Sequence, residues 1–337
     1  MVEGGAGLSA LPKVALVGCG HWGKNLCRNF SALGALGMVV DSTESGQATA
    51  RKLASQVSVS STIEKALGDP TVHAIALATP AETHADLAIR AMEAGKDVFV
   101  EKPMALTLDD AERMRDVAIR EGRILMVGHL LEYHPAVLKL RQLVDGNELG
   151  GINYIYSNRL NFGKVRTEEN ALWSFAPHDV AVILRLMGQS PIEISATGGS
   201  YLTQGLADVT VSNMRFSDDS RAHVFVSWLH PFKEQRLVVV GDKKMAIFND
   251  VATFGEKLLL YPQTVEFEGK IPVLKNEDFE PIEYTDAEPL REECRHFLDC
   301  VTNRNKPLTD AQSGIEVLKV LHACQSSIDH NGVPVIL

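Results

Sequence analysis

Three short segments of the sequence combine residue types that could act on a small molecule. The segment GCGHWG, residues 18–23, has the glycine spacing G-x-G-x-x-G. The segment EKP places the carboxylate of Glu101 beside the ammonium of Lys102 at the end of an apolar run. The segment PHD contains His178, whose imidazole can exchange a proton near neutral pH. These groups together suit cofactor binding and proton transfer.

The glycine-rich segment predicts a dinucleotide-binding turn, because an apolar run precedes it and a helical pattern follows it. Gly18 permits the tight turn, Gly20 lets the backbone approach a pyrophosphate, and Gly23 lets the helix pack closely on the strand. The helix N-terminus supplies N–H groups and the positive end of its dipole. A plain glycine turn is the alternative interpretation. We expect the intervening residues His21 and Trp22 to contact the cofactor as well.

Asp41 ends the next apolar run, about where an acidic residue hydrogen-bonds the adenosine ribose. A carboxylate there would repel a 2′-phosphate, and the nearest following basic residues are Arg51 and Lys52. The sequence therefore favours NAD over NADP, with Ser42 as a neighbouring contact. A solvated aspartate at a strand end is the alternative.

In the first third of the chain, predicted strands alternate with predicted helices, and these elements would position the groups named above. Fully apolar runs separated by helical patterns predict a parallel sheet covered on both faces. In such sheets ligands bind at the carboxyl ends of the strands. The apolar runs are 13–17, 36–41, 72–78, 97–101 and 123–128, and the helical patterns are 24–34, 61–68, 82–95 and 107–122.

After about residue 150 the chain carries long runs in which apolar and polar residues often alternate, followed by two helical segments. Such alternation predicts an antiparallel sheet with one buried face. The predicted fold is therefore α/β: a doubly wound parallel Rossmann domain over 12–130, then an α+β domain over 131–337 with a large, mostly antiparallel, open-faced sheet. The boundary is expected within 130–151, and the terminal helices could pack back on the first domain. The open face predicts a homodimer or homotetramer.

Composition narrows the class of protein. A formal net charge of −10 disfavours nucleic acid or an anionic membrane as the partner. The five cysteines form no C-x-x-C pair, which indicates reduced thiols in the cytoplasm and neither a disulfide framework nor a zinc site. We find no metal-ligand spacing, no apolar run long enough to cross a bilayer and no signal-peptide pattern at the N-terminus.

The segment ATPAETHADLAIRAMEAGKDVFVEKPMALT resembles the Gfo/Idh/MocA family of sugar and cyclitol oxidoreductases. The shared features are Thr-Pro, a helix with an early histidine, and Glu-Lys-Pro. The resemblance continues through GHLLEYHPAVLKL, APHDV and NKPLTDAQSGIEVLKVLHAC, and covers nearly the whole chain from about residue 12. It implies hydride transfer between a sugar ring hydroxyl or ketone and a nicotinamide.

The resemblance implies that Lys102 lies beside the nicotinamide and hydrogen-bonds the reacting hydroxyl, while Pro103 shapes the turn that aims it. Like charge nearby could lower the pKa of this lysine. A surface ion pair of Glu101 is the alternative interpretation. Further cofactor contacts are expected at the strand ends: Thr79, Pro80, His84, Glu101 and His129.

His178 is the second catalytic candidate. Members of the family usually carry an aspartate one helical turn before this histidine, which acts as general base. Here Ser174 takes the aspartate position, so Ser174 could hydrogen-bond the substrate, or Asp179 could orient His178. A packed core histidine is the alternative, although the Pro-His-Asp context predicts a helix start near the site.

Substrate contacts are expected from Tyr133, Arg159, Asn161 and Trp173, with ordinary packing as the alternative for each. The segment VSWLHPFKEQRLVVVGDKKMAIFND resembles family members that act on nucleotide sugars, such as dehydrogenases that oxidise C3 of UDP-N-acetylglucosaminuronate. In that case three basic residues could bind a diphosphate or uronate: Lys164, Lys233 and Arg236. A solvated charged hairpin is the alternative for that segment.

Other functions remain open on the sequence alone. An inositol or free-sugar dehydrogenase, or a 3-keto-sugar reductase, would have the same fold. A non-catalytic NAD-binding regulatory protein is a further alternative, because a fold does not fix a function.

Overall fold

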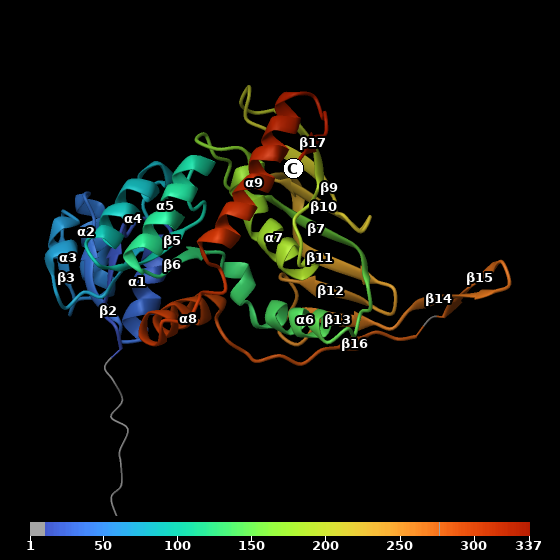
Figure 1. Cartoon of the computed structure of the whole chain (residues 1–337), viewed down its shortest axis with the longest axis horizontal. Helices are drawn as coiled ribbons and strands as arrows, with labels where there is room; N and C mark the ends of the chain where they lie inside the picture. Colours follow the sequence, from blue (N-terminus) through green and yellow to red (C-terminus); the bar gives the residue numbers. More distant parts are fainter. Residues whose placement is uncertain (1–10, 276) are drawn as a thin grey trace, which may run out of the picture. The chain divides into compact units, whose positions relative to one another are not determined.

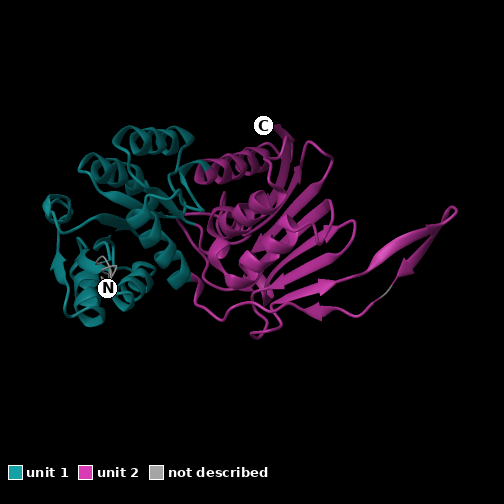
Figure 2. Cartoon of the chain, turned by 60° about the horizontal axis from the view of Figure 1, so that its bottom comes forward, with its two compact units in different colours: residues 1–128, 290–312 teal, residues 129–289, 313–337 magenta. Residues whose placement is uncertain are grey.

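The computed structural model describes residues 11–275 and 277–337 of the chain. The chain divides into two compact units (Figure 2). Unit 1 comprises Met1–Gly128 and Leu290–Gln312, and unit 2 comprises His129–Pro289 and Ser313–Leu337. The chain thus leaves unit 1 for unit 2, returns to unit 1, and ends in unit 2.

Unit 1 is built on a six-stranded parallel sheet with the strand order β3-β2-β1-β4-β5-β6. This is the order of a doubly wound dinucleotide-binding fold, so the predicted Rossmann sheet is confirmed. The residue pattern did not predict β3, which has only three residues. The strands are β1 (Val14–Val17), β2 (Leu36–Val40), β3 (Ser58–Ser60), β4 (Ala74–Leu77), β5 (Asp97–Glu101) and β6 (Leu125–Gly128).

The helices of unit 1 begin and end at residues suited to those positions. The Thr107 side chain accepts a hydrogen bond from the Asp110 amide at 3.1 Å and caps α5. Gly122 ends α5 in the left-handed conformation, with φ of 59°. The helices are α1 (Gly23–Ala32), α2 (Glu44–Leu53), α3 (Glu64–Gly68), α4 (His84–Glu93), α5 (Leu108–Glu121) and α8 (Pro289–Asn303), with the 3-10 turn η1 (Ala81–Thr83).

The core of unit 1 draws on both of its chain segments. Phe99 of β5, Phe30 of α1 and Phe297 of α8 pack edge to face, with ring centroids 5.7 to 6.5 Å apart. After α8, the Thr309 hydroxyl donates to the Val127 carbonyl of β6 at 2.6 Å. Residues 290–312 therefore complete this core rather than extending from it.

Unit 2 is built on a nine-stranded mixed sheet with the order β16-β13-β12-β11-β7-β10-β9-β8-β17 (Figure 1). All neighbouring strands that pair are antiparallel except β7 and β10, so the predicted, mostly antiparallel second sheet is confirmed. The strands are β7 (Ile152–Phe162), β8 (Glu193–Gly199), β9 (Val209–Arg215), β10 (Arg221–Ser227), β11 (Leu229–Gly241), β12 (Met245–Asn249), β13 (Leu258–Tyr261), β16 (Glu280–Pro281) and β17 (Val335–Ile336).

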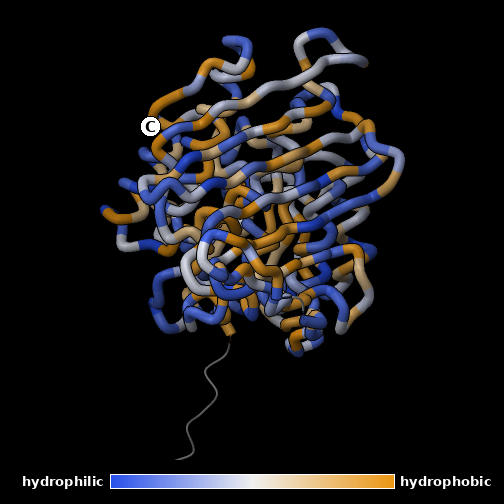
Figure 3. Tube along the Cα trace, turned by 90° about the vertical axis from the view of Figure 1, so that its right-hand side faces the viewer, coloured by the Kyte–Doolittle hydropathy of each residue, from blue (hydrophilic) through white to orange (hydrophobic). Residues whose placement is uncertain are grey.

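Helices cover one face of this sheet. On β10, Ala222, Val224 and Val226 are at most 2% exposed and face α7. The residues between them point to the opposite face, and Figure 3 shows the resulting alternation of hydrophobic and hydrophilic positions along the strands. The helices of unit 2 are α6 (Pro135–Asp145), α7 (Ala171–Met187) and α9 (Ala311–Asp329), with the 3-10 turn η2 (Leu130–Tyr133).

Candidate functional site

The glycine turn between β1 and α1 has a backbone that only glycine accommodates at two positions. Gly18 has φ of +91°, and a Cβ there would lie 2.6 Å from the Ala78 carbonyl oxygen. A Cβ on Gly23 would lie 2.0 Å from the Gly18 carbonyl oxygen. A Cβ on Gly20 would meet no atom within 4 Å, so this part of the turn is open to an approaching ligand. No side chain caps α1, whose N-terminus follows the turn. The turn therefore fits a dinucleotide pyrophosphate.

Asp41 follows β2 and joins two loops. Its Oδ2 accepts from the Cys19 amide at 2.7 Å, and its Oδ1 accepts from the Thr43 amide and hydroxyl at 2.8 and 2.7 Å. Burial alone would raise the pKa of this carboxyl, but the hydrogen bonds outweigh burial and lower it. Asp41 is therefore ionised at neutral pH, where the sequence predicts the adenosine ribose. Ser42 beside it is exposed.

Glu101, at the end of β5, is a buried acid attached to the glycine turn. It is 7% exposed and accepts a hydrogen bond from the indole N–H of Trp22. Gly128 on β6 provides the space, because a Cβ there would lie 2.9 Å from Glu101 Oε2. Burial raises the pKa of Glu101 to about 7, against the effects of Trp22 and Lys102. Residue spacing alone predicts neither this contact nor the raised pKa of Glu101.

Lys102 follows Glu101, and the Lys102–Pro103 peptide bond is cis. The buried side chain of His84, which is 1% exposed, contacts this turn. The His84 Nδ1 lies 2.9 Å from the Pro103 carbonyl oxygen, and its Nε2 lies 3.0 Å from the Thr79 carbonyl oxygen. Burial lowers the pKa of His84, so the ring is neutral and donates to one of these carbonyls. His84 thus holds the Thr79 and Pro103 turns together, while Pro80 is exposed.

In unit 2, α7 places Ser174 and His178 one turn apart on the same helix face. Ser174 is 4% exposed, and His178 is half-buried. The helix starts at Ala171, with the Asn170 side chain accepting from the Trp173 amide at 3.2 Å. Pro177 therefore lies inside the helix, and the prediction that Pro-His-Asp marks a helix start is wrong. The asparagine cap, seven residues upstream, gives the true start.

Asp179 contacts β7 with both carboxylate oxygens. Arg159 Nε and Nη2 donate to it at 2.6 and 3.1 Å, and the Ser157 hydroxyl donates at 2.7 Å. Asp179 is 2% exposed, so this is a buried, bidentate ion pair. The arrangement fixes α7 on the sheet.

The other expected substrate contacts of unit 2 range from buried to exposed. Trp173 donates from its indole to Gln325 Oε1 at 3.3 Å and packs its ring edge to face on His322. Tyr133 is 3% exposed, and Asn161 is half-buried at the end of β7. His129, the expected cofactor contact after β6, is 2% exposed. The basic side chains Lys164 and Lys233 are exposed.

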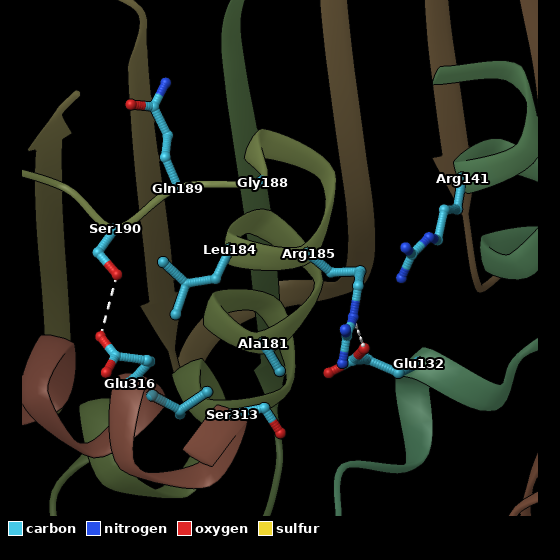
Figure 4. Close-up of a pocket in the computed structure, with 11 residues that line it drawn as sticks. Glu132, Arg141, Ala181, Leu184, Arg185, Gly188, Gln189, Ser190, Ser313 and Glu316 are labelled. Carbon is cyan, nitrogen blue, oxygen red and sulfur yellow. Dashed lines mark hydrogen bonds and ion pairs between the residues drawn. The ribbon is translucent and has the colours of Figure 1, made fainter. Parts of the chain in front are cut away.

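A cavity of about 300 Å³ lies beside the C-terminal half of α7 (Figure 4). Two of its charged residues pair with each other across the lining. Arg185 Nε donates to Glu132 Oε2 at 2.6 Å, and the Ser190 hydroxyl donates to Glu316 at 3.0 Å. Glu132 is 4% exposed, so its pair with Arg185 ties η2 to α7. The residue pattern did not predict this pair.

Two absences apply to the residues the structure describes. Among residues 11–275 and 277–337, no group of three His, Cys, Asp or Glu side chains is placed to hold a metal ion. No helix within those ranges is both long and apolar enough to cross a membrane.

Comparison with known proteins identifies the family. Residues 12–129 match the profile described as "Oxidoreductase family, NAD-binding Rossmann fold", and residues 137–247 match the "GFO/IDH/MocA C-terminal domain". The 2,7-anhydro-N-acetylneuraminate hydratase of Mediterraneibacter gnavus is 29% identical over 72% of this chain and 68% of its own.

Two further relatives match over most of their length. The UDP-N-acetylglucosamine 3-dehydrogenase of Acidithiobacillus ferrooxidans is 24% identical over 91% of this chain and 94% of its own. A solved structure described as an oxidoreductase from Magnetospirillum magnetotacticum is 30% identical, with a TM-score of 0.81 over 94% of this chain and all of its own. The chain therefore belongs to the Gfo/Idh/MocA family of NAD-binding oxidoreductases.

Proposed function

We propose that this protein is an NAD-dependent dehydrogenase that oxidises a ring hydroxyl of a nucleotide-linked or acidic sugar. The observation that carries the proposal is the glycine turn, open at Gly20 and followed by an uncapped helix, with the ionised Asp41 beside it. A negative charge at Asp41 favours the ribose diol of NAD over the phosphate of NADP.

The cofactor would be held by residues of unit 1 and by His129, the first residue of unit 2. The glycine turn would bind the pyrophosphate, Asp41 and Ser42 the adenosine ribose, and the strand ends the nicotinamide half. The neighbouring contacts are His21, Trp22, Thr79, Pro80, Glu101 and Lys102, together with His129, while His84 would position the Thr79 and Pro103 turns. Bound NAD supplies the carbon that takes up the hydride.

The proton of the reacting hydroxyl passes to His178, the proposed general base. Lys102 donates a hydrogen bond to the same oxygen and stabilises the negative charge that grows on it as its proton leaves. Ser174 stands where relatives with the usual pattern carry an aspartate, and we assign it a hydrogen bond to the substrate. Arg159 is a proposed substrate contact from β7, with its charge offset by Asp179.

The substrate class rests on two observations. One full-length relative is named as a UDP-N-acetylglucosamine 3-dehydrogenase. Exposed Lys164 and Lys233 supply positive charge in a protein of net charge −10, which suits a diphosphate or a uronate. Tyr133, Asn161 and Trp173 are the remaining proposed contacts. The five cysteines are all reduced and buried, and we place the protein in the cytoplasm as a homo-oligomer.

The test is NADH production, followed at 340 nm, with a panel of nucleotide sugars, uronates, inositols and aldoses, each with NAD and with NADP. Lys102→Ala and His178→Ala should each reduce turnover by about 10²-fold or more while NAD affinity changes little. Lys65→Ala, at an exposed position on α3, is the control and should match the wild type. Turnover of Lys102→Ala within a few-fold of wild type would contradict the role given to the lysine.

A non-catalytic NAD-binding regulator is the second candidate, favoured by the serine at position 174. Such a protein would bind NADH, raise its fluorescence and never change its redox state with any member of the panel. Oxidation of any one sugar rejects it.

A further inference from the structure

The cavity beside α7 lies at the opposite end of that helix from the proposed general base. His178 belongs to the N-terminal half of α7, while the cavity is lined by Ala181, Leu184 and Arg185. Arg185 follows His178 by two helical turns, which is about 10 Å along the axis. The other walls come from η2, α6, α9 and the loop after α7, all within unit 2. The described lining includes none of the residues given a catalytic or cofactor role above.

The lining contains two arginines and two glutamates, and three of these four side chains have close partners. Arg185 Nε donates to Glu132 Oε2 at 2.6 Å, and Glu132 is 4% exposed, so these two charges offset each other. Glu316 accepts from the Ser190 hydroxyl on one carboxylate oxygen and from Lys319 on the other, both at 3.0 Å. The formal charges of the four lining side chains sum to zero.

Arg141, on α6, is the exception. Its Nε donates to Asp145 Oδ2 at 3.1 Å, but the Asp145 side chain is 62% exposed, so this is a surface pair of low strength. Its Nη1 is buried and has no acceptor among the residues that the structure describes. A guanidinium N–H that is removed from water and unbonded is unfavourable. The position of Nη1 therefore suits an acceptor supplied by a ligand.

The lining is polar on two sides and apolar between them (Figure 4). Arg141 lies on one side, Ser190 and Glu316 lie on the other, and Ala181 and Leu184 of α7 lie between these groups. A carboxylate can accept about four hydrogen bonds, so Glu316 retains acceptor capacity beyond its bonds to the protein. A volume of about 300 Å³ is at the lower end of the range for ligand pockets, which limits the ligand to a small molecule.

We propose that this cavity binds a small carboxylic acid that carries a hydrogen-bond donor at its far end, as a hydroxy acid or an amino acid does. The carboxylate accepts from Arg141, the aliphatic part packs on Ala181 and Leu184, and the far donor bonds Glu316. A single negative charge suits this balanced lining. The double charge of a phosphate group would face the lining glutamates, while Arg185 is already paired. The proposal concerns a second ligand site and is independent of the catalytic assignment.

The test is a ligand-observed NMR titration of the full-length protein with butyrate, 4-hydroxybutyrate, 4-aminobutyrate and inorganic phosphate. At least one of the acids with a terminal donor should bind saturably, with a dissociation constant of about 1 mM or lower. That acid should bind at least about threefold more tightly than butyrate and about tenfold more tightly than phosphate. Absence of saturable binding by both acids up to about 20 mM would overturn the proposal, and so would phosphate binding of equal strength.

Two variants place the acid in the cavity. Arg141→Met removes the guanidinium and should weaken binding at least about tenfold. Ser313→Leu adds bulk to the lining from α9, keeps all four lining charges, and should weaken binding by a similar factor. Arg113→Met is the matched control, because Arg113 is also paired with an aspartate of its own helix but its side chain is 67% exposed. It should remain within about threefold of the wild type.

Circular dichroism checks that each variant is folded. Equal weakening by Arg141→Met and Arg113→Met would mean that the acid responds only to net charge, and unchanged affinity in folded Ser313→Leu would place it outside the cavity. Either result overturns the proposal. Because an acidic sugar is among the proposed substrates, His178→Ala distinguishes the two sites and should bind the acid within about threefold of the wild type. Loss of binding in that variant would place the acid at the proposed active site, which contradicts a second site and leaves the proposed hydride transfer standing.

Discussion

Replacing Glu101 by glutamine should make the protein more stable at alkaline pH and leave its stability at acidic pH nearly unchanged. Burial raises the pKa of Glu101 from its model-compound value of 4.5 to about 7. Between these two pH values the folded protein binds a proton that the unfolded chain has released. The free energy of unfolding therefore falls as pH rises from 4.5 to about 7, and then remains level.

The size of the effect follows from the difference between the two pKa values. One unit corresponds to about 1.4 kcal/mol, so the burial of Glu101 costs on the order of 3 kcal/mol above pH 7. Glutamine keeps the carbonyl oxygen that accepts from Trp22 and cannot ionise. Its amide would face the Lys102 amide, which lies 3.3 Å from Glu101 Oε2, and this reduces the gain.

Two assays measure this. Urea unfolding, monitored through hydrogen exchange of the β5 amides, gives the free energy of unfolding of unit 1 at pH 5, 6, 7 and 8. The fluorescence of Trp22 should titrate with an apparent pKa near 7 in the wild type and not in Glu101→Gln. A stability difference between the two proteins that is independent of pH would refute the reasoning, and so would one that grows toward acidic pH.

Two further substitutions test the glycine turn and the Asp179–Arg159 ion pair. Gly23→Ala should abolish measurable NAD binding in titration calorimetry, because its Cβ would lie 2.0 Å from a backbone oxygen of the turn. The control variant Gly68→Ala should bind NAD normally, because a Cβ there meets nothing within 4 Å. Asp179→Ala should lower the stability of unit 2 by about 3–5 kcal/mol in denaturant unfolding, because it leaves the Arg159 charge buried without its partner. Asp86→Ala, which removes an exposed ion pair, should cost under about 1 kcal/mol, and equal losses in the two aspartate variants would contradict this account.

The sequence predicted those elements of the fold whose residue pattern matches the burial of their side chains. The strands of the parallel sheet that it identified are almost wholly buried, so their composition alone marks them. It missed α2, whose buried residues are the small Gly46 and Ala50, so that no large apolar side chain marks its buried face. It also began a helical pattern at residue 61, but α3 begins at Glu64 and no side chain caps it.

Contacts between distant residues could not be predicted in this way. Trp22 and Glu101 are 79 residues apart, and their hydrogen bond depends on the order in which β1 and β5 enter the sheet. The pairing of Asp179 with Arg159 likewise depends on how α7 packs on β7. Sequence patterns identified candidate groups, while the tertiary structure determined which of them are neutral, ionised or paired.

The return of residues 290–312 to unit 1 has a consequence for biosynthesis. Phe297 belongs to the aromatic cluster around Phe99, and Thr309 bonds to β6. A nascent chain that ends anywhere before these residues lacks part of its first core, even though the six parallel strands have already left the ribosome. The amino-terminal segment of unit 1 should therefore wait, incompletely packed, until translation has passed through every strand of the large sheet except β17.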